Sequence, residues 1–243
     1  MAAPSLTPGE LGACIAAFVR LAALVATAPV VGDTGVSVRA RLAFVVAAAA
    51  GIGLNRPSVS YDELPATCIL EMGVGLITGL SARFVMSRVA IAGQLMGFAL
   101  GLGFASEYDA HAGESAGVVR MLTTSFAGLA FVAAGGLEAV VRSAGAGPAT
   151  VTQLAGLGPM MMSHGVSAMG RGLALAAPIV LAALVGNIGL AVMNRAAPAV
   201  NVFSIAFAAV LIIGGALMIA CAPSFAAGVI ASAGDAVAAL LGS

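Results

Sequence analysis

The 243-residue sequence has no lysine and no tryptophan, and all ten of its basic residues are arginine. Without lysine, the chain cannot contain a phosphate-binding loop that ends in Gly-Lys-Ser or Gly-Lys-Thr. Charged residues make up only 8% of the chain, against about 25% in ordinary soluble domains. So few polar side chains cannot cover a water-facing surface, and 61% of the residues are hydrophobic. We therefore expect an integral membrane protein.

Residues that could carry chemistry are equally scarce. The two histidines, His111 and His164, lie far apart in what we expect to be separate loops, without zinc-ligand spacing. The three cysteines, Cys14, Cys68 and Cys221, lie inside apolar stretches, which is typical of small buried hydrophobic residues. We expect no catalytic site, no metal, no cofactor and no enzyme. The formal net charge of zero gives no basic patch for nucleic acid.

Long apolar stretches predict an all-α, multi-helix membrane protein, because an open strand in hydrocarbon would leave its backbone groups unpaired. Seven stretches can be distinguished, at residues 11–31, 42–54, 64–82, 89–106, 116–141, 172–193 and 202–232. The fifth contains a Gly135-Gly136 break, and Pro178 and Pro223 interrupt the last two. Taken literally they give seven spans, although several depart from the roughly 20 residues that a spanning helix needs.

Arginines in the expected connections indicate an orientation. The side that carries most of them would be cytoplasmic, since positive charge is retained there. That side has Arg39, Arg41, Arg83, Arg88, Arg142 and Arg171, and the other side has only Arg56 and Arg195. The acidic segment 107–114 would then face the periplasm, and residues 143–164 would form a loop.

Charges also occur in or beside the apolar stretches, at Arg20, Glu71, Arg83, Arg88 and Arg120. A lone charge at the bilayer centre costs roughly 2.5–3.5 kcal/mol on insertion scales, so such groups are paired or line a wet passage. One interpretation is a structural ion pair between Glu71 and an arginine of a neighbouring helix. The alternatives are contacts with a partner subunit or a proton relay through Glu71.

Glycines recur at intervals of four residues in the middle of the chain, at Gly75 and Gly79 and again at Gly93, Gly97 and Gly101. Small residues at this spacing line one face of a helix and let two backbones approach closely. The pattern predicts tight helix packing, within the chain or with another subunit.

Three stretches resemble the FliR family and its injectisome counterparts. Residues 20–42 read RLAALVATAPVVGDTGVSVRARL, residues 71–109 read EMGVGLITGLSARFVMSRVAIAGQLMGFALGLGFASEYD, and residues 187–214 read NIGLAVMNRAAPAVNVFSIAFAAVLIIG. The signature positions are Gln94, Arg195, Pro198, Asn201 and Phe203. The chain departs from the family at 206–210, where Ala-Phe-Ala-Ala-Val replaces part of the usual Gly-Phe-Pro-x-Lys continuation.

The resemblance implies a single FliR-type membrane domain over residues 1–243, with helical hairpins packed into a hetero-oligomeric export gate. FliP-type and FliQ-type subunits would be its neighbours, and FlhB-type and FlhA-type proteins would join it at the flagellar basal body in the inner membrane. Unfolded polypeptides would pass through the gate. Much of the apolar sequence would then pack on neighbours above the bilayer, which would make the count of seven spans misleading. Arg20, Glu71, Arg83 and Arg88 would hold the subunit in its assembly.

The same resemblance implies that the loop after the glycine-rich helix plugs the pore. The matching residues are Phe104, Ala105, Ser106, Glu107, Tyr108, Asp109, Ala110, His111, Ala112, Gly113 and Glu114. Phe104 and Tyr108 would supply bulk, while Gly103 and Gly113 would allow hinging. From composition alone, an ordinary polar loop between two membrane helices explains the segment better than a plug, and the resemblance reverses this preference.

Other functions remain open at this stage. The closeness of the central stretch favours a flagellar subunit, and the equivalent subunit of a virulence injectisome is the alternative. A small-molecule or ion transporter would predict paired titratable groups near the midplane and internal repeats with broken helices. The sequence shows no convincing repeat. A membrane scaffold without a pore would differ from the gate only in that respect.

Overall fold

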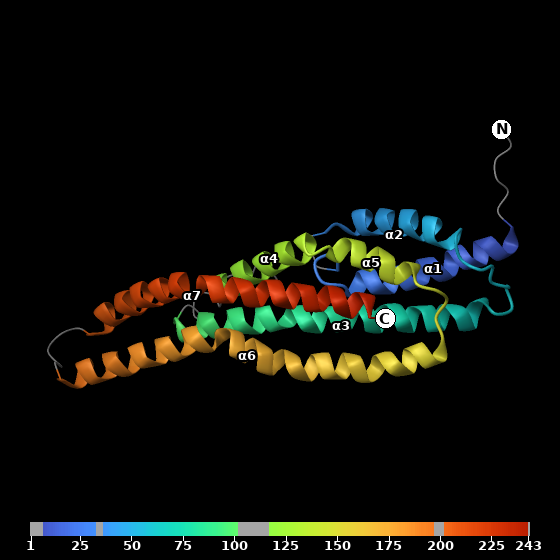
Figure 1. Ribbon diagram of the computed structural model, residues 1–243. Helices are drawn as coiled ribbons and strands as arrows, with labels where there is room; N and C mark the ends of the chain where they lie inside the picture. The colour runs from blue at the N-terminus through green and yellow to red at the C-terminus, as the bar shows by residue number, and fades with distance from the viewer. Residues whose placement is uncertain (1–6, 33–35, 102–116, 197–201, 243) are drawn as a thin grey trace. The chain divides into compact units, whose positions relative to one another are not determined.

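A computed structural model describes residues 7–32, 36–101, 117–196 and 202–242. These residues form helices, with no strand among them (Figure 1). The helices are α1 (Pro8–Thr27), α2 (Val38–Gly53), α3 (Leu64–Ala99), α4 (Val118–Ala133), α5 (Gly136–Gly145), α6 (Val151–Ala196) and α7 (Val202–Leu241). The expected all-α class is confirmed.

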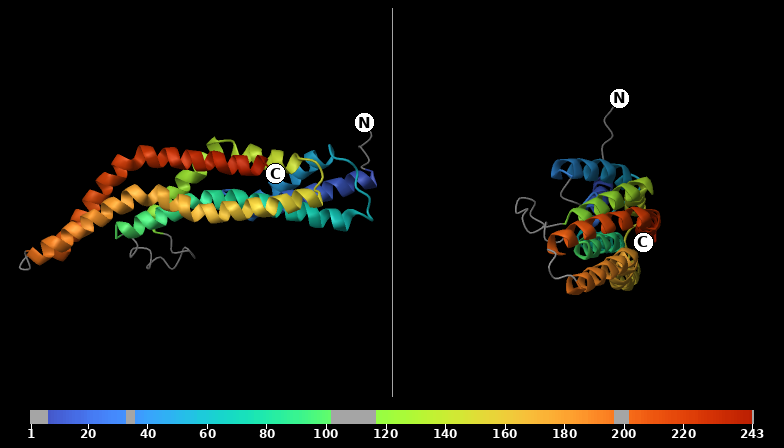
Figure 2. Two further views of the ribbon diagram at one scale, coloured as in Figure 1. Left: turned by 60° about the horizontal axis from the view of Figure 1, so that its bottom comes forward. Right: turned by 90° about the vertical axis from the view of Figure 1, so that its left-hand side faces the viewer.

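The chain divides into two compact units. Unit 1 comprises Met1–Met86, Phe131–Val166 and Ala233–Ser243, and unit 2 comprises Ser87–Ala130 and Ser167–Ser232. Helices α3, α6 and α7 each contribute residues to both units, and Figure 2 shows their ribbons from two further sides.

Four helices of the described chain, α1, α3, α6 and α7, are long and apolar enough to cross a membrane. A fifth span is possible if α4 and α5, which bend by 57° at their junction, count together. The prediction of seven separate spans is wrong, because the stretches at 64–82 and 89–106 merge in the continuous helix α3. Arg83 and Arg88 therefore lie inside a helix, and the arginine count that set the cytoplasmic side loses its basis.

Two further boundaries differ from expectation, and one agrees with it. The predicted loop at 143–164 is helical from Val151 onward, so His164 lies in α6 rather than in a loop. Pro178 and Pro223 lie inside α6 and α7 without ending either helix. The Gly135-Gly136 break is confirmed, because Gly135 adopts a positive φ of 84° between α4 and α5.

Unit 1 is organised around α1, which packs against α2 and α5. The helix begins with a capping box in which the Thr7 backbone N–H donates to Glu10 and the Glu10 N–H donates to the Thr7 hydroxyl. Its buried face is made of small and aliphatic side chains, among them Ala13, Ala17 and Leu21. Small side chains bring the neighbouring backbones close, which places the charged residues described below.

Unit 2 has an apolar core. Its buried residues come from α3, α4 and α6, and α7 packs onto them. The cluster contains Ala92, Met96, Leu100, Val119, Ala176, Ile179 and Ala183, with Met218, Cys221 and Phe225 against it.

Candidate functional site

Three charged side chains meet in the interior of unit 1, and we call Arg20, Arg56 and Glu71 the charge cluster. Arg20 comes from α1, Arg56 from the turn after α2, and Glu71 from the second turn of α3. The side chains of Arg20 and Glu71 are fully buried, and that of Arg56 is 6% exposed. Charged side chains are rarely this deeply buried unless they are paired, so the geometry of the pairing decides what the cluster can do.

Glu71 is the centre of the charge cluster. Its Oε2 accepts a hydrogen bond from Nη1 of Arg20 at 3.3 Å, and its Oε1 accepts one from Nη1 of Arg56 at 2.9 Å. The backbone N–H of Ala149 also donates to Oε1, at 3.0 Å. Both carboxylate oxygens are therefore held by fixed donors from separate parts of the chain. The structural ion pair that the sequence suggested for Glu71 is present, with Arg20 as its partner.

The two arginines fix the connection between α5 and α6. Nη2 of Arg56 donates to the carbonyl oxygens of Ala144 and Ala146 at 2.7 and 2.6 Å, and Nη1 of Arg20 donates to that of Gly147 at 3.0 Å. The last carbonyls of a helix have no partner within the helix and carry partial negative charge. The guanidinium of Arg56 at the end of α5 donates hydrogen bonds to these carbonyls, and its positive charge offsets their partial negative charge. The cluster thus joins α1, the α2–α3 turn, α3 and the α5–α6 connection.

The charge cluster contains two cations and one anion. A buried ion pair gains little over well-packed apolar residues, but removal of one partner typically costs 3–5 kcal/mol because the other charge stays buried. Here the loss of Glu71 would leave two guanidinium groups in the interior. Three of their nitrogen atoms, Nε and Nη2 of Arg20 and Nε of Arg56, already have no acceptor among the described residues. Unit 1 therefore depends strongly on the Glu71 carboxylate.

Glycines bring α1 and α3 close enough for this pairing. A side chain at Gly75 would collide with the backbone carbonyl of Arg20. One at Gly79 would lie 2.8 Å from the carbonyl oxygen of Leu24 and would also meet Thr27. The four-residue glycine spacing in α3 is thus the feature that seats α1 against it and sets Arg20 beside Glu71.

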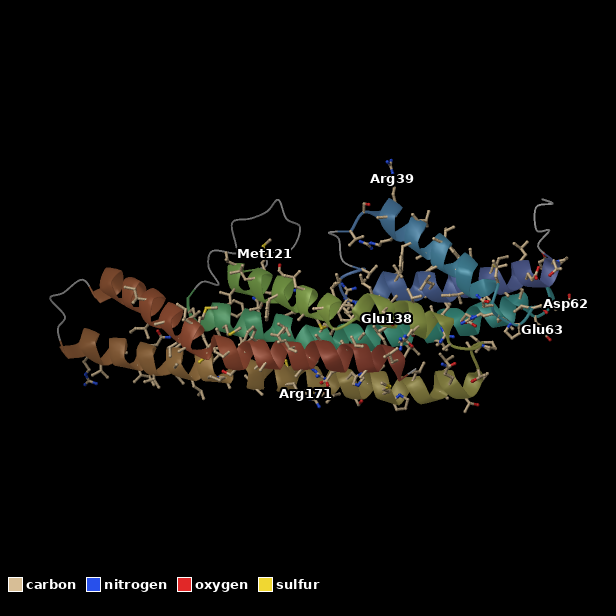
Figure 3. All side chains as sticks on the ribbon, turned by 45° about the horizontal axis from the view of Figure 1, so that its top comes forward. Arg39, Asp62, Glu63, Met121, Glu138 and Arg171 are labelled. Atoms are coloured by element: carbon tan, nitrogen blue, oxygen red, sulfur yellow. The ribbon has the colours of Figure 1, made fainter. Side chains whose placement is uncertain are left out.

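Several other charges of unit 1 lie on its surface. Arg39, Asp62, Glu63 and Glu138 are exposed, and Figure 3 shows Arg39 pointing away from its helix. Glu138 pairs with Arg142 across one turn of α5 at 2.7 Å, but both side chains are about two-thirds exposed, at 67% and 68%. Exposed pairs of this kind contribute about 0.3–0.5 kcal/mol.

Arg83 and Arg88, which were also expected to be buried, differ in exposure. Arg88 is 3% exposed and lies in unit 2, outside the charge cluster. Arg83 is an exposed residue of α3, contrary to expectation, because the register that turns Glu71 inward turns position 83 outward. Arg56 was expected in a connection, where it lies, but its burial against Glu71 was not expected. No sequence pattern marks this arginine as a partner of Glu71.

The second glycine series lies in unit 2. A side chain at Gly93 would lie 2.9 Å from Cα of Arg120 and would meet Thr123, and one at Gly97 would lie 3.7 Å from Cβ of Val119. Both glycines therefore face α4. Gly101 differs from the other two, because it follows the end of α3 with a positive φ of 72°, and a side chain there would meet no atom of the described residues within 4 Å.

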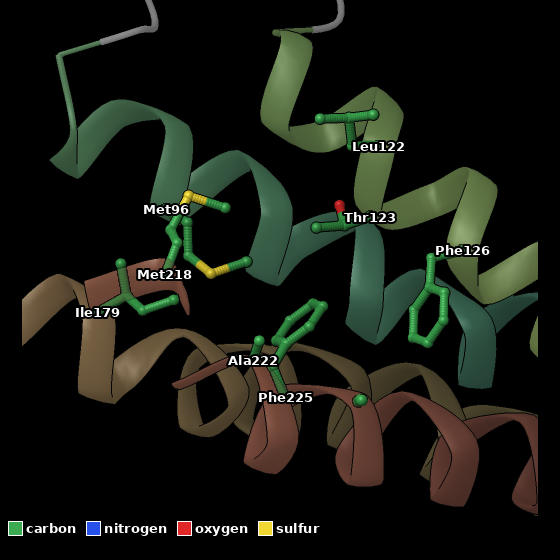
Figure 4. Close-up of a pocket in the computed structure, with 9 residues that line it drawn as sticks. Met96, Leu122, Thr123, Phe126, Ile179, Met218, Ala222 and Phe225 are labelled. Carbon is green, nitrogen blue, oxygen red and sulfur yellow. The ribbon is translucent and has the colours of Figure 1, made fainter. Parts of the chain in front are cut away.

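Unit 2 also contains two apolar hollows. One, of about 260 Å³, is lined by Met96, Phe126, Ile179, Met218 and Phe225 among others (Figure 4). The other, of about 480 Å³, is lined by Ser87, Ala90, Ile91, Gln94, Leu95, Arg120, Met169 and Leu173. The family-signature residue Gln94 thus lies at the second hollow.

Several residues singled out from the sequence lie outside the described residues or can be placed only in part. The plug residues 104–114, Pro198 and Asn201 fall outside the description, and so does the side chain of Phe203 in α7. Arg195 is exposed near the end of α6. In the described ranges, no three His, Cys, Asp or Glu residues gather in a way that could hold a metal ion.

The sequence matches known proteins over most of its length. The family model of bacterial export proteins, family 1, matches residues 11–234. Flagellar biosynthetic protein FliR of Pectobacterium carotovorum is 27% identical over 213 residues, which cover 81% of this chain and 79% of that protein. The FliR proteins of Escherichia coli K12 and Caulobacter vibrioides are 26% and 30% identical over 221 and 220 residues, covering 85% and 83% of this chain and 83% and 84% of theirs. With its helical membrane fold and the family model spanning both units, the chain belongs to the FliR family of bacterial export proteins.

Proposed function

We propose that this membrane protein is a subunit of the flagellar type III export gate in the bacterial inner membrane, where it forms part of the pore for unfolded flagellar substrates. The observation that carries the proposal is the match to the export family over residues 11–234, together with relatives that are named as flagellar biosynthetic proteins. The flagellar names favour this reading over an injectisome subunit.

The charge cluster supports a structural rather than a catalytic role. A proton carrier needs a second titratable group nearby, whereas the side-chain partners of Glu71 are arginines, which do not release protons in proteins. Fixed donors hold both carboxylate oxygens. In our proposal the subunit is not an enzyme, uses no cofactor, and contributes shape while energy for export comes from elsewhere.

The apolar surface of α6 supports association with other helices or lipid. Leu181, Leu184, Val185, Ile188 and Val192 are each more than half exposed. Patches of this kind mark membrane or protein contacts. We propose FliP-type and FliQ-type subunits as neighbours, with FlhB-type and FlhA-type proteins at the basal body. The proposal treats residues 1–243 as one functional membrane domain, within which Arg20, Glu71, Arg83 and Arg88 serve assembly.

Co-expression with the FliP-type and FliQ-type proteins of the same bacterium tests the proposal. After mild extraction, native mass spectrometry should find a discrete complex that contains one copy of this chain and several copies of each partner. A chain that is recovered as a monomer or homo-oligomer, and binds neither protein, would contradict the proposal and favour a transporter or scaffold.

We further propose that residues 104–114 plug the pore. Gly113→Leu, or deletion of residues 107–113, should make cells permeable to small ions, because a gate without its plug conducts. The control is Gly156→Leu in α6, where a side chain meets no atom within 4 Å. Unchanged ion permeability in cells that still contain the complete complex would count against a plug at this position.

A further inference from the structure

We call the larger of the two hollows in unit 2, of about 480 Å³, the groove. It differs from an ordinary packing defect because a charged residue, Arg120, lines it. Its walls come from α3, α4 and α6, and most of the lining side chains are apolar, among them Ile91, Leu95 and Leu173. The volume falls within the roughly 300–1,000 Å³ that small-molecule sites occupy. It is therefore large enough for a ligand.

Two glycine contacts fix the walls of the groove. At Gly93 the backbone of α4 passes so close to α3 that an added side chain would lie 2.9 Å from Cα of Arg120. At Gly172 the backbone of α6 approaches α3, where a side chain would lie 2.9 Å from the carbonyl oxygen of Arg88 and from Ile91. Arg120 is thus held level with Gln94, while α6 closes the groove nearer Ile91. Arg120 and Gln94 lie side by side in a groove whose other lining residues, apart from Ser87, are apolar.

Among the described residues, nothing neutralises the positive charge of Arg120. Its side chain is partly buried, and within that part of the chain it has no ion pair or side-chain hydrogen bond. The residue lies in the first turn of α4, where free backbone N–H groups and the helix dipole add positive potential. Gln94 lines the groove beside Arg120, and its buried Oε1 accepts no hydrogen bond from the described residues. An anion in the groove would neutralise Arg120.

Exposed apolar side chains line the groove on α6. Met169 and Leu173 are 68% and 53% exposed, and they lie in a helix that is long and apolar enough to span a membrane. The cationic group and the apolar walls of the groove match the anionic headgroup and the acyl chains of a phospholipid.

We propose that this groove binds an anionic phospholipid. The phosphate lies on Arg120 and the first N–H groups of α4, and an acyl chain lies along Ile91, Leu95 and Leu173. Basic pockets between membrane helices bind anionic headgroups in this way. A partner helix fits less well, because a helix about 10 Å wide fills such a volume with little more than one turn. The proposal does not depend on a role in export.

Native mass spectrometry of the full-length chain in defined lipid tests this site. The probes are phosphatidylglycerol, phosphatidylcholine with the same acyl chains, and inorganic phosphate. We expect retained phosphatidylglycerol, a loss of about fivefold in its occupancy for Arg120→Gln, and near-normal occupancy for Arg120→Lys. Arg39→Gln is the matched control, since it removes an exposed arginine far from the groove in sequence and should leave occupancy unchanged.

A second variant tests the apolar walls of the groove without altering charge. Ala90→Phe fills the groove and should also displace phosphatidylglycerol, while the protein keeps its helical circular dichroism. Equal retention of phosphatidylcholine, unchanged occupancy in Arg120→Gln, or displacement by inorganic phosphate alone would overturn the proposal. So would a photo-reactive residue at position 173 that cross-links to a partner polypeptide instead of lipid.

Discussion

The interiors of the two compact units differ in chemistry. Unit 1 encloses the charge cluster, where one carboxylate holds two arginines and through them the α5–α6 connection. Unit 2 is centred on an apolar cluster around Met96, Leu100 and Ile179. Buried polar contacts demand a defined geometry, whereas apolar packing tolerates changes of partner when volume is kept. Unit 1 is therefore the part that a single polar substitution should disrupt most.

The largest effect is expected from Glu71→Gln. The amide keeps the shape of the side chain but leaves the guanidinium groups of Arg20 and Arg56 buried without an anion, at a cost of about 3–5 kcal/mol. Hydrogen exchange should accelerate in α1 and in the α5–α6 connection before it changes in α4. Equal protection of both units in the variant and the unchanged protein would remove the proposed difference between them.

Met96→Ala should destabilise unit 2 and leave unit 1 unchanged, which is the opposite of the effect of Glu71→Gln. Met96 is 1% exposed in the core of unit 2, and truncation of a buried methionine costs about 2–5 kcal/mol through lost contacts and the cavity left behind. The expected result is faster hydrogen exchange in α4 and in the α6 segment after Ser167, with α1 unchanged. If hydrogen exchange in α1 accelerates by the same factor, the two units unfold as one cooperative unit.

Gly75→Ala tests the backbone contact that seats the charge cluster. The added methyl group meets the carbonyl of Arg20, so α1 must shift, and overpacking of this kind costs about 1–3 kcal/mol. The midpoint of thermal unfolding in detergent should fall. Gly51→Ala is the matched control in α2, where a side chain meets no atom within 4 Å and alanine should stabilise the helix by about 0.5–1 kcal/mol. A fall of the same size in both variants would show that the contact at Gly75 is unimportant.

The smallest effect is expected from Glu138→Gln. This substitution removes the exposed partner of Arg142 and should change the free energy of unfolding by less than about 0.5 kcal/mol. The same assay, applied to Glu71→Gln and Glu138→Gln, compares a buried carboxylate with an exposed one. Comparable losses would mean that burial does not set the importance of Glu71.

The sequence predicted the helical membrane class and the break at Gly135-Gly136, and it offered the structural pairing of Glu71 with an arginine of a neighbouring helix as one of three interpretations. These features follow from local chemistry, because a glycine pair weakens a helix and a lone carboxylate in an apolar stretch needs a cation. The glycine spacing at 75 and 79 likewise predicted a close helix contact, and α1 is its partner.

The errors arose where local sequence does not decide the outcome. Arg83 and Arg88 suggested a polar connection between two spans, yet α3 continues through both positions. A long side chain can reach water or a partner from inside a helix, so an arginine need not end one. Pro178 and Pro223 likewise lie inside α6 and α7 without ending either helix. Arg56 was missed because only the three-dimensional path of the α2–α3 turn brings it to Glu71.

The charge cluster makes the most direct link between the structure and the proposed gate. Each of Glu71→Ala, Arg20→Ala and Glu138→Gln should be co-expressed with the FliP-type and FliQ-type proteins, and the amount of this chain recovered in the complex should be measured. We predict that Glu71→Ala and Arg20→Ala lose most of the complex while Glu138→Gln retains it. Normal recovery of Glu71→Ala in an intact complex would contradict a role of the charge cluster in assembly.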